Sequence, residues 1–216
     1  MDILFAKWRE HLKERNINEK FVEDGIIDKE NYRNIVWLLR ETNDYSGKVH
    51  QLIRECIHNP KEHKKYWKTP NTHYKQSLAI AGLLHPDLSY REIKKMKKTA
   101  LLHAAVVNIK KTSGKNKANV DQILNFLKND KSFIKEEVLL IKPKVVIVGG
   151  MKSLKSIRNE IIKLFNLDKI DTDLFVSREN NIYFIATYHP AYPAIKHQEW
   201  TEMFKNIARE YKIDLS

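Results

Sequence analysis

Residues 34–44 read Asn34-Ile-Val-Trp-Leu-Leu-Arg-Glu-Thr-Asn-Asp44, an apolar run that stops abruptly in a cluster of ionisable and amide side chains. A buried parallel strand has this pattern, because helices cover both of its faces and its carboxyl end faces a site. We therefore expect a central strand over residues 35–39 that delivers polar side chains to its carboxyl end.

Two later segments repeat the pattern. Residues 102–107 run apolar and stop at Asn108, and residues 183–188 stop at His189. Carboxyl ends of parallel strands lie at one edge of a sheet, where α/β proteins bind their ligands. We expect Glu41, Asn108 and His189 to converge there.

A fourth apolar segment, residues 145–148, ends at Gly149-Gly150, a small-residue turn into a helix. Helical spacing of apolar residues separates the strands along the chain. This alternation predicts a three-layer α/β/α sandwich with a central four-stranded, mainly parallel sheet. No linker-like segment interrupts the 216 residues. We expect a single domain over residues 1–216, with a helix within residues 1–20 packed on it.

Composition excludes several classes of protein. No apolar run reaches the roughly 20 residues of a membrane helix, and the first residues lack a signal-peptide cleavage site, so we expect a cytoplasmic protein. The single cysteine, Cys56, excludes an intrachain disulfide and any cluster held by several thiolates. The spacing of His58, His63 and His73 matches no pattern of metal ligands. The sequence also contains no phosphate-loop motif and no dinucleotide-binding motif. We expect no metal and no cofactor.

The charge is strongly positive, with 39 Lys and Arg against 27 Asp and Glu and a formal net charge of +12. Such a chain attracts polyanions, which makes nucleic acid the leading partner class, although a lysine-rich source would give the same balance. Residues 58–75 form a basic polar segment that contains Tyr66 and Trp67. These two rings either stack on a base or pack at the edge of the core.

Three short places resemble the uracil-DNA glycosylase superfamily. Residues 38–44 occupy the place of its first catalytic motif, and residues 106–111 are similar to the strand whose terminal Asn reads the base. Residues 188–193 resemble its His-Pro-Ser motif. The resemblance covers residues 20–212 and implies a repair enzyme that flips a base out of DNA and hydrolyses its N-glycosidic bond.

The resemblance also implies roles for individual residues. As catalytic residues, Glu41 or Asp44 would act on water or the sugar, and His189 would donate to the leaving base. The base-binding residues would be Asn108, Thr42, Asn43, Tyr66 and Trp67. The DNA-binding residues would be Lys110, Lys111, Lys115, Lys152, Pro190, Ala191 and Tyr192. The partner would be single- or double-stranded DNA with a modified base, bound by a monomer.

Three positions depart from the family pattern. Thr42 stands where several branches carry an Asp or Asn that activates water, Asn43 replaces a Pro, and Ala191 replaces the Ser of His-Pro-Ser. The single cysteine also excludes the iron-sulfur cluster of the thermostable branches. Two alternatives stay open: a nucleic-acid-binding module that has lost catalysis, and a hydrolase of small nucleosides or bases, which a pocket without a basic rim would favour.

Overall fold

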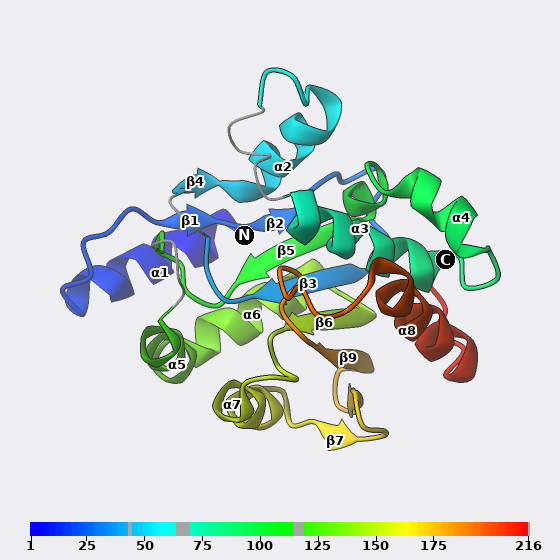
Figure 1. Cartoon of the computed structure of the whole chain (residues 1–216). Helices are drawn as coiled ribbons and strands as arrows, with labels where there is room; N and C mark the ends of the chain where they lie inside the picture. Colours follow the sequence, from blue (N-terminus) through cyan, green and yellow to red (C-terminus); the bar gives the residue numbers. More distant parts are fainter. Residues whose placement is uncertain (43–44, 64–69, 115–118, 216) are drawn as a thin grey trace.

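The protein is described by a computed structural model over residues 1–42, 45–63, 70–114 and 119–215. It is a mixed α/β protein with a central, mostly parallel sheet between two layers of helices (Figure 1). The sheet order is β2-β5-β3-β6-β9-β8-β7. The strands are β2 (Gly25–Ile26), β3 (Ile35–Leu39), β5 (Ala104–Asn108), β6 (Val145–Gly149), β7 (Asp168–Lys169), β8 (Leu174–Ser177) and β9 (Ile182–Thr187).

The four predicted strands form the parallel centre, β5-β3-β6-β9. Three further strands extend this centre, because β2 adds antiparallel to β5 at one edge, and β8 and β7 add antiparallel beyond β9. Two of these three extra strands have only two residues. A strand this short has no alternation to detect, since its pairing is decided by distant segments.

Side chains alternate across the sheet and build two cores. In β3, Ile35 and Trp37 join one core, whereas Val36 and Leu38 join the other. Helices α2 (Val49–His58), α3 (Pro70–Leu84), α4 (Tyr90–Ile93) and α8 (His197–Glu210) cover the first core. Helices α1 (Asp2–Glu14), α5 (Val120–Asn129), α6 (Lys131–Ile141) and α7 (Lys155–Phe165) cover the second (Figure 1).

Short elements complete the chain. A separate parallel pair joins β1 (Val22–Glu23) to β4 (Gly47–Lys48), and the 3-10 helices η1 (Lys94–Met96) and η2 (Ala100–His103) precede β5. Among the described residues, no helix has the length and apolar character needed to cross a membrane.

The connections place a topological switch point on the carboxyl edge of the sheet. The chain leaves β3 for helices on the first face, and it leaves β6 for α7 on the second face. Because neighbouring loops diverge to opposite faces there, the space outside the carboxyl ends of β3 and β6 is the topological switch point at which α/β sheets bind ligands.

Candidate functional site

Glu41 lies just beyond β3 and is held by the turn after β5. The Lys110 Nζ donates to Glu41 Oε2 over 3.0 Å, and the two side chains are 6% and 3% exposed. Backbone pairing places them together, because the Lys110 N–H donates to the Arg40 carbonyl at 2.9 Å. Within the described ranges the second oxygen, Glu41 Oε1, is buried without a hydrogen-bond partner. A buried carboxylate with one free oxygen can orient a water molecule or stabilise a developing positive charge.

Gly114 closes over this carboxylate. Its N–H donates to the Thr42 carbonyl at 2.7 Å, and a Cβ added at Gly114 would lie 2.3 Å from the Glu41 carboxyl carbon. Only glycine leaves Glu41 the space that it occupies. The Thr42 hydroxyl donates to the Tyr45 carbonyl at 2.7 Å and thereby stabilises the turn after β3.

His189 follows β9 and is half-buried. Its Nδ1 accepts the Ala191 N–H at 3.2 Å, so the neutral ring carries its proton on Nε2. Burial, and then the positive charge of Arg40, lower the pKa of His189 to about 4. His189 is therefore a neutral hydrogen-bond donor at pH 7.

Pro190 fixes the loop that carries His189. It is buried, and a Cβ on Gly149 would meet the Pro190 Cδ at 3.4 Å and the Leu39 Cδ2 at 3.0 Å. The Thr187 carbonyl also accepts the Gly150 N–H at 2.9 Å. The ends of β3, β6 and β9 thus pack on one another. Pro190 contacts the protein, and its expected contact with DNA stays a prediction.

Asn108 ends β5 in a buried polar network. Its Nδ2 donates to Asp24 Oδ1 at 3.0 Å, and its backbone N–H donates to Oδ2 of the same carboxylate at 2.5 Å. The residue is 1% exposed. The bond to Asp24 uses one N–H of the amide that was expected to read a base, and within the described residues Oδ1 has no hydrogen-bond partner.

Lys111 lies at the centre of the same network. Its Nζ contacts Asp24 and lies 2.6 Å from Glu137 Oε2, and all three side chains are fully buried. Burial opposes the charge on Lys111, but the two carboxylates outweigh it and raise the pKa of the amine. Burial also raises the pKa of Glu137 to about 7, although Lys111 opposes this shift.

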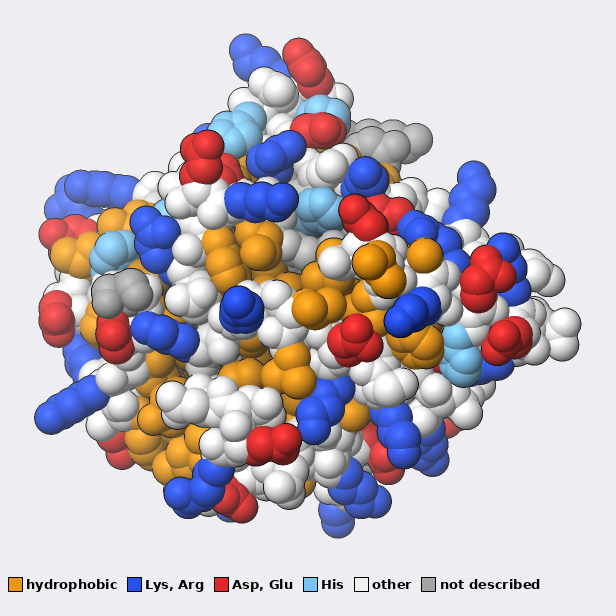
Figure 2. All heavy atoms as spheres, turned by 180° about the vertical axis from the view of Figure 1, so that it is seen from behind, with side chains coloured by type: hydrophobic (Ala, Val, Ile, Leu, Met, Phe, Trp, Pro, Cys, Tyr) orange, Lys and Arg blue, Asp and Glu red, His pale blue; other side chains and the backbone are white. Residues whose placement is uncertain are grey.

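Three of the four lysines expected to bind DNA are paired with carboxylates, so their contact with DNA stays a prediction. Lys111 is enclosed, Lys110 is bound to Glu41, and Lys152 forms an ion pair with Asp173 at 2.5 Å. The partners of Lys110 and Lys111 are buried, whereas Lys152 and Asp173 are 30% and 21% exposed. On the face drawn in Figure 2, Lys and Arg side chains lie around the whole outline among acidic ones, not in one stripe.

The remaining predicted residues divide into two groups. Ala191 and Tyr192 are exposed, and the Tyr192 ring stacks on Tyr188 with 4.7 Å between ring centroids, so DNA contact there stays a prediction. Asn43, Asp44, Tyr66, Trp67 and Lys115 lie outside the described residues.

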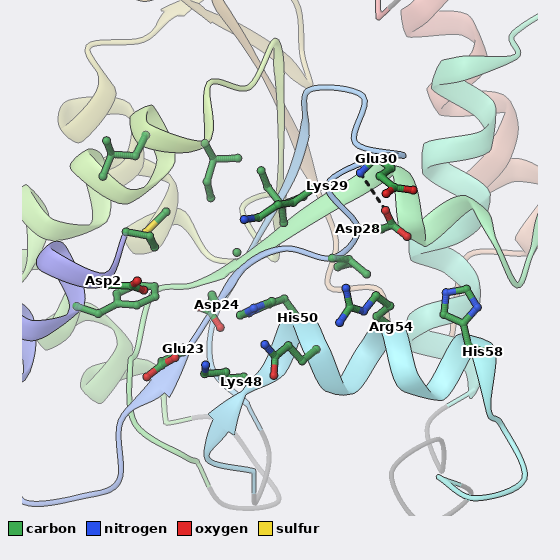
Figure 3. Close-up of a pocket in the computed structure, with 18 residues that line it drawn as sticks. Asp2, Glu23, Asp24, Asp28, Lys29, Glu30, Lys48, His50, Arg54 and His58 are labelled. Carbon is green, nitrogen blue, oxygen red and sulfur yellow. Dashed lines mark hydrogen bonds between the residues drawn. The ribbon is translucent and has the colours of Figure 1, made fainter.

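A pocket of about 960 Å³ opens along β2, between α1, α2 and α6 (Figure 3). Figure 3 shows His50 extending from α2 towards Asp24, with Lys48 and Glu23 beside it. Burial lowers the pKa of His50. The lining mixes carboxylates and cations, and it includes neither Glu41 nor His189. The pocket therefore touches the Asp24 network, whereas the ends of β3 and β9 form a separate candidate site.

The sequence did not point to three residues of the candidate site and the buried network, namely Arg40, Asp24 and Glu137. Arg40 lies within the first motif, residues 38–44, but the resemblance gives it no role. Glu137 shares the buried face of α6 with Ile134 and Val138. A charged residue on an apolar helical face is a readable signal for a buried network. In the described part of the chain, no group of three His, Cys, Asp or Glu side chains is placed to hold a metal ion.

The chain matches no model of a known protein family, and no curated protein is similar enough to be counted as a relative.

Proposed function

We propose that the protein is a DNA glycosylase of the uracil-DNA glycosylase superfamily, acting as a monomer on uracil or another modified base flipped out of DNA. In this proposal the parallel centre β5-β3-β6-β9 is that family's sheet. The observation that carries the proposal is the neutral His189, with its proton on Nε2, at the same sheet edge as the buried Glu41 carboxylate.

The chemistry assigns each of them a role. The C1′–N bond breaks and its electron pair leaves with the base, while the His189 Nε2–H donates to the base oxygen on which negative charge develops. Glu41 stabilises the positive sugar and orients the water whose oxygen bonds to C1′. A proton from that water neutralises the base, so that the products are free base and an abasic site.

A second candidate is a hydrolase of small nucleosides. The observation that favours it is the pairing of Lys110, Lys111 and Lys152 with carboxylates, because paired lysines do not present a positive rim to a DNA backbone.

The test is base release from labelled oligonucleotides that carry uracil, hypoxanthine, xanthine or a bulky modified cytosine, with alkali cleavage at abasic sites. Free deoxynucleosides of the same bases are assayed in parallel. We expect release from an oligonucleotide, with a loss of about 100-fold or more in His189→Ala. The matched control is His85→Ala, because His85 is exposed beyond the end of α3.

Three outcomes would contradict the proposal. Release from deoxynucleosides alone would select the second candidate. Salt-sensitive binding to every oligonucleotide without release would select a binding module that has lost catalysis. Equal release by the wild type and His189→Ala would place the chemistry elsewhere.

A further inference from the structure

Arg40 occupies the topological switch point. It is the first residue after β3, and its side chain runs across the end of the neighbouring strand β6. A Cβ added at Gly150 would lie 3.9 Å from the Arg40 Cδ and 4.0 Å from its Nε, which is ordinary contact distance. Gly150 also has a φ of +91°, a conformation that suits glycine. The guanidinium stem therefore lies over a strand end where α/β sheets bind ligands.

Glu41 favours the charged form of Arg40, but its carboxylate is shared with Lys110. Glu41 is paired with Lys110 at 3.0 Å, and His189 is neutral. Over residues 1–42, 45–63, 70–114 and 119–215, Arg40 forms no ion pair, and its buried Nε has no acceptor. Burial lowers the pKa of the guanidinium, and the negative charge of Glu41 opposes this shift without cancelling it. A partly desolvated cation in this state gains most from an anionic ligand.

A hydroxyl group is also unsatisfied at this edge. Thr187, the last residue of β9, pairs with Gly149 in the sheet and is fully buried. In the described portion of the chain its Oγ1 has no hydrogen-bond partner. Each buried polar atom without a partner needs an explanation, and these two lie at the carboxyl ends of β3 and β9, on either side of β6, where a polar ligand could satisfy both.

We propose that Arg40 binds a phosphate group of the substrate at this switch point. The planar guanidinium presents Nε–H and Nη–H as a fork that matches two oxygens of one phosphate. The inference rests on the proposed function only for its substrate class, in which the phosphate belongs to the nucleotide whose base is released. Arg40 is then a substrate-binding residue, and His189 acts on the base at the same edge.

The experiment follows the Arg40 Nε–H resonance of the ¹⁵N-labelled protein by NMR at constant ionic strength. The probes are inorganic phosphate, deoxyuridine monophosphate and deoxyuridine. We expect saturable shifts with the first two and none with deoxyuridine. The two Arg40 variants lack that resonance, so their binding is followed at the backbone amide of Gly150, which lies beside the Arg40 side chain. Arg40→Gln is expected to weaken phosphate binding at least tenfold, and Arg40→Lys by less, because an ammonium keeps the charge but loses the fork. Arg91→Gln is the matched control, since Arg91 is exposed on α4.

The binding readout does not require turnover, so the two proposals can fail separately. Saturable phosphate binding that depends on Arg40 in a protein that releases no base would uphold the phosphate site and contradict the glycosylase. Unchanged phosphate affinity in a folded Arg40→Gln protein would overturn the inference. Wild-type resonances that respond equally to chloride, or to deoxyuridine, would overturn it as well.

Discussion

The Glu41–Lys110 ion pair ties the end of β3 to the turn after β5, and both side chains are nearly inaccessible. Removing one partner leaves an unpaired buried charge, which costs more than removing both. We expect Lys110→Met to lower the free energy of unfolding by about 3 kcal/mol. Adding Glu41→Gln should recover at least about 1 kcal/mol. Urea denaturation of the two single variants and the double variant tests this coupling, and strictly additive effects would contradict it.

The environment of His189 predicts two pH dependences. Its pKa of about 4 lies below the ordinary value of 6.5. The unfolded chain therefore takes up a proton first as pH falls. The contribution of His189 to stability is complete above pH 6.5 and is lost as pH falls towards 4, by up to about 3 kcal/mol. Base release, which needs the neutral ring, should also fall only near pH 4.

An NMR titration of the His189 ring nitrogens measures this pKa directly. Arg40→Gln should raise it, because the positive charge of Arg40 is the second cause of the shift after burial. A wild-type midpoint near 6.5 would show that His189 is well solvated, contrary to the structure.

The turn after β5 sets the position of Glu41. Gly114→Ala would place its Cβ 2.3 Å from the Glu41 carboxyl carbon, so the carboxylate must leave its ion pair or the turn must open. We expect base release to drop at least tenfold, with KM changed less than kcat. Ser113→Ala is the control, because it changes the neighbouring side chain and keeps the carbonyl that accepts from Lys110. Full activity of Gly114→Ala would remove Glu41 from the mechanism.

Helix α6 carries Glu137 on its buried face, and this predicts a further pH dependence of the free energy of unfolding. Burial raises the pKa of Glu137 to about 7, above its ordinary value of 4.5, so its contribution to stability is lost as pH rises between these values. Glu137→Gln should leave stability nearly unchanged at pH 5 and increase it at pH 8. Urea denaturation at both pH values tests this, with the exposed Glu136→Gln as control. Equal destabilisation at both pH values would contradict it.

The main elements could be predicted because their signals are local. The apolar run of residues 35–39 is β3, and Ser89 and Glu92 form the capping box that their spacing predicts at α4. Helix α2 buries Val49, Ile53 and Cys56, whose spacing in the sequence is helical.

The polar network could not be predicted, because its partners are distant in sequence. Lys111 and Asp24 are separated by 87 positions, and nothing near Lys111 distinguishes it from Lys110. Glu41 and His189 could be predicted as candidate site residues because each is the second residue after its strand. Arg40 follows β3 too, but its significance depends on Gly150 and on charges that only the fold brings near.

At the scale of the whole molecule, the net charge of +12 favours a polyanionic partner, but the charged side chains described near the candidate site do not form a basic surface for one. The excess of Lys and Arg favours a polyanion, whereas the described lysines nearest the candidate site are paired with carboxylates. The two features are compatible if DNA is attracted by charge spread over the surface and if a single phosphate is recognised by Arg40.

The central claim is that the carboxyl edge of the sheet releases a base from DNA. Its most direct test is the single-turnover rate of free uracil release from a single-stranded oligonucleotide, with mass-spectrometric detection of the base, for the wild type and Glu41→Gln. We predict stoichiometric release by the wild type and a rate at least about 100-fold lower in the variant. No release of uracil by the wild type, or equal rates in the two folded proteins, would contradict the claim.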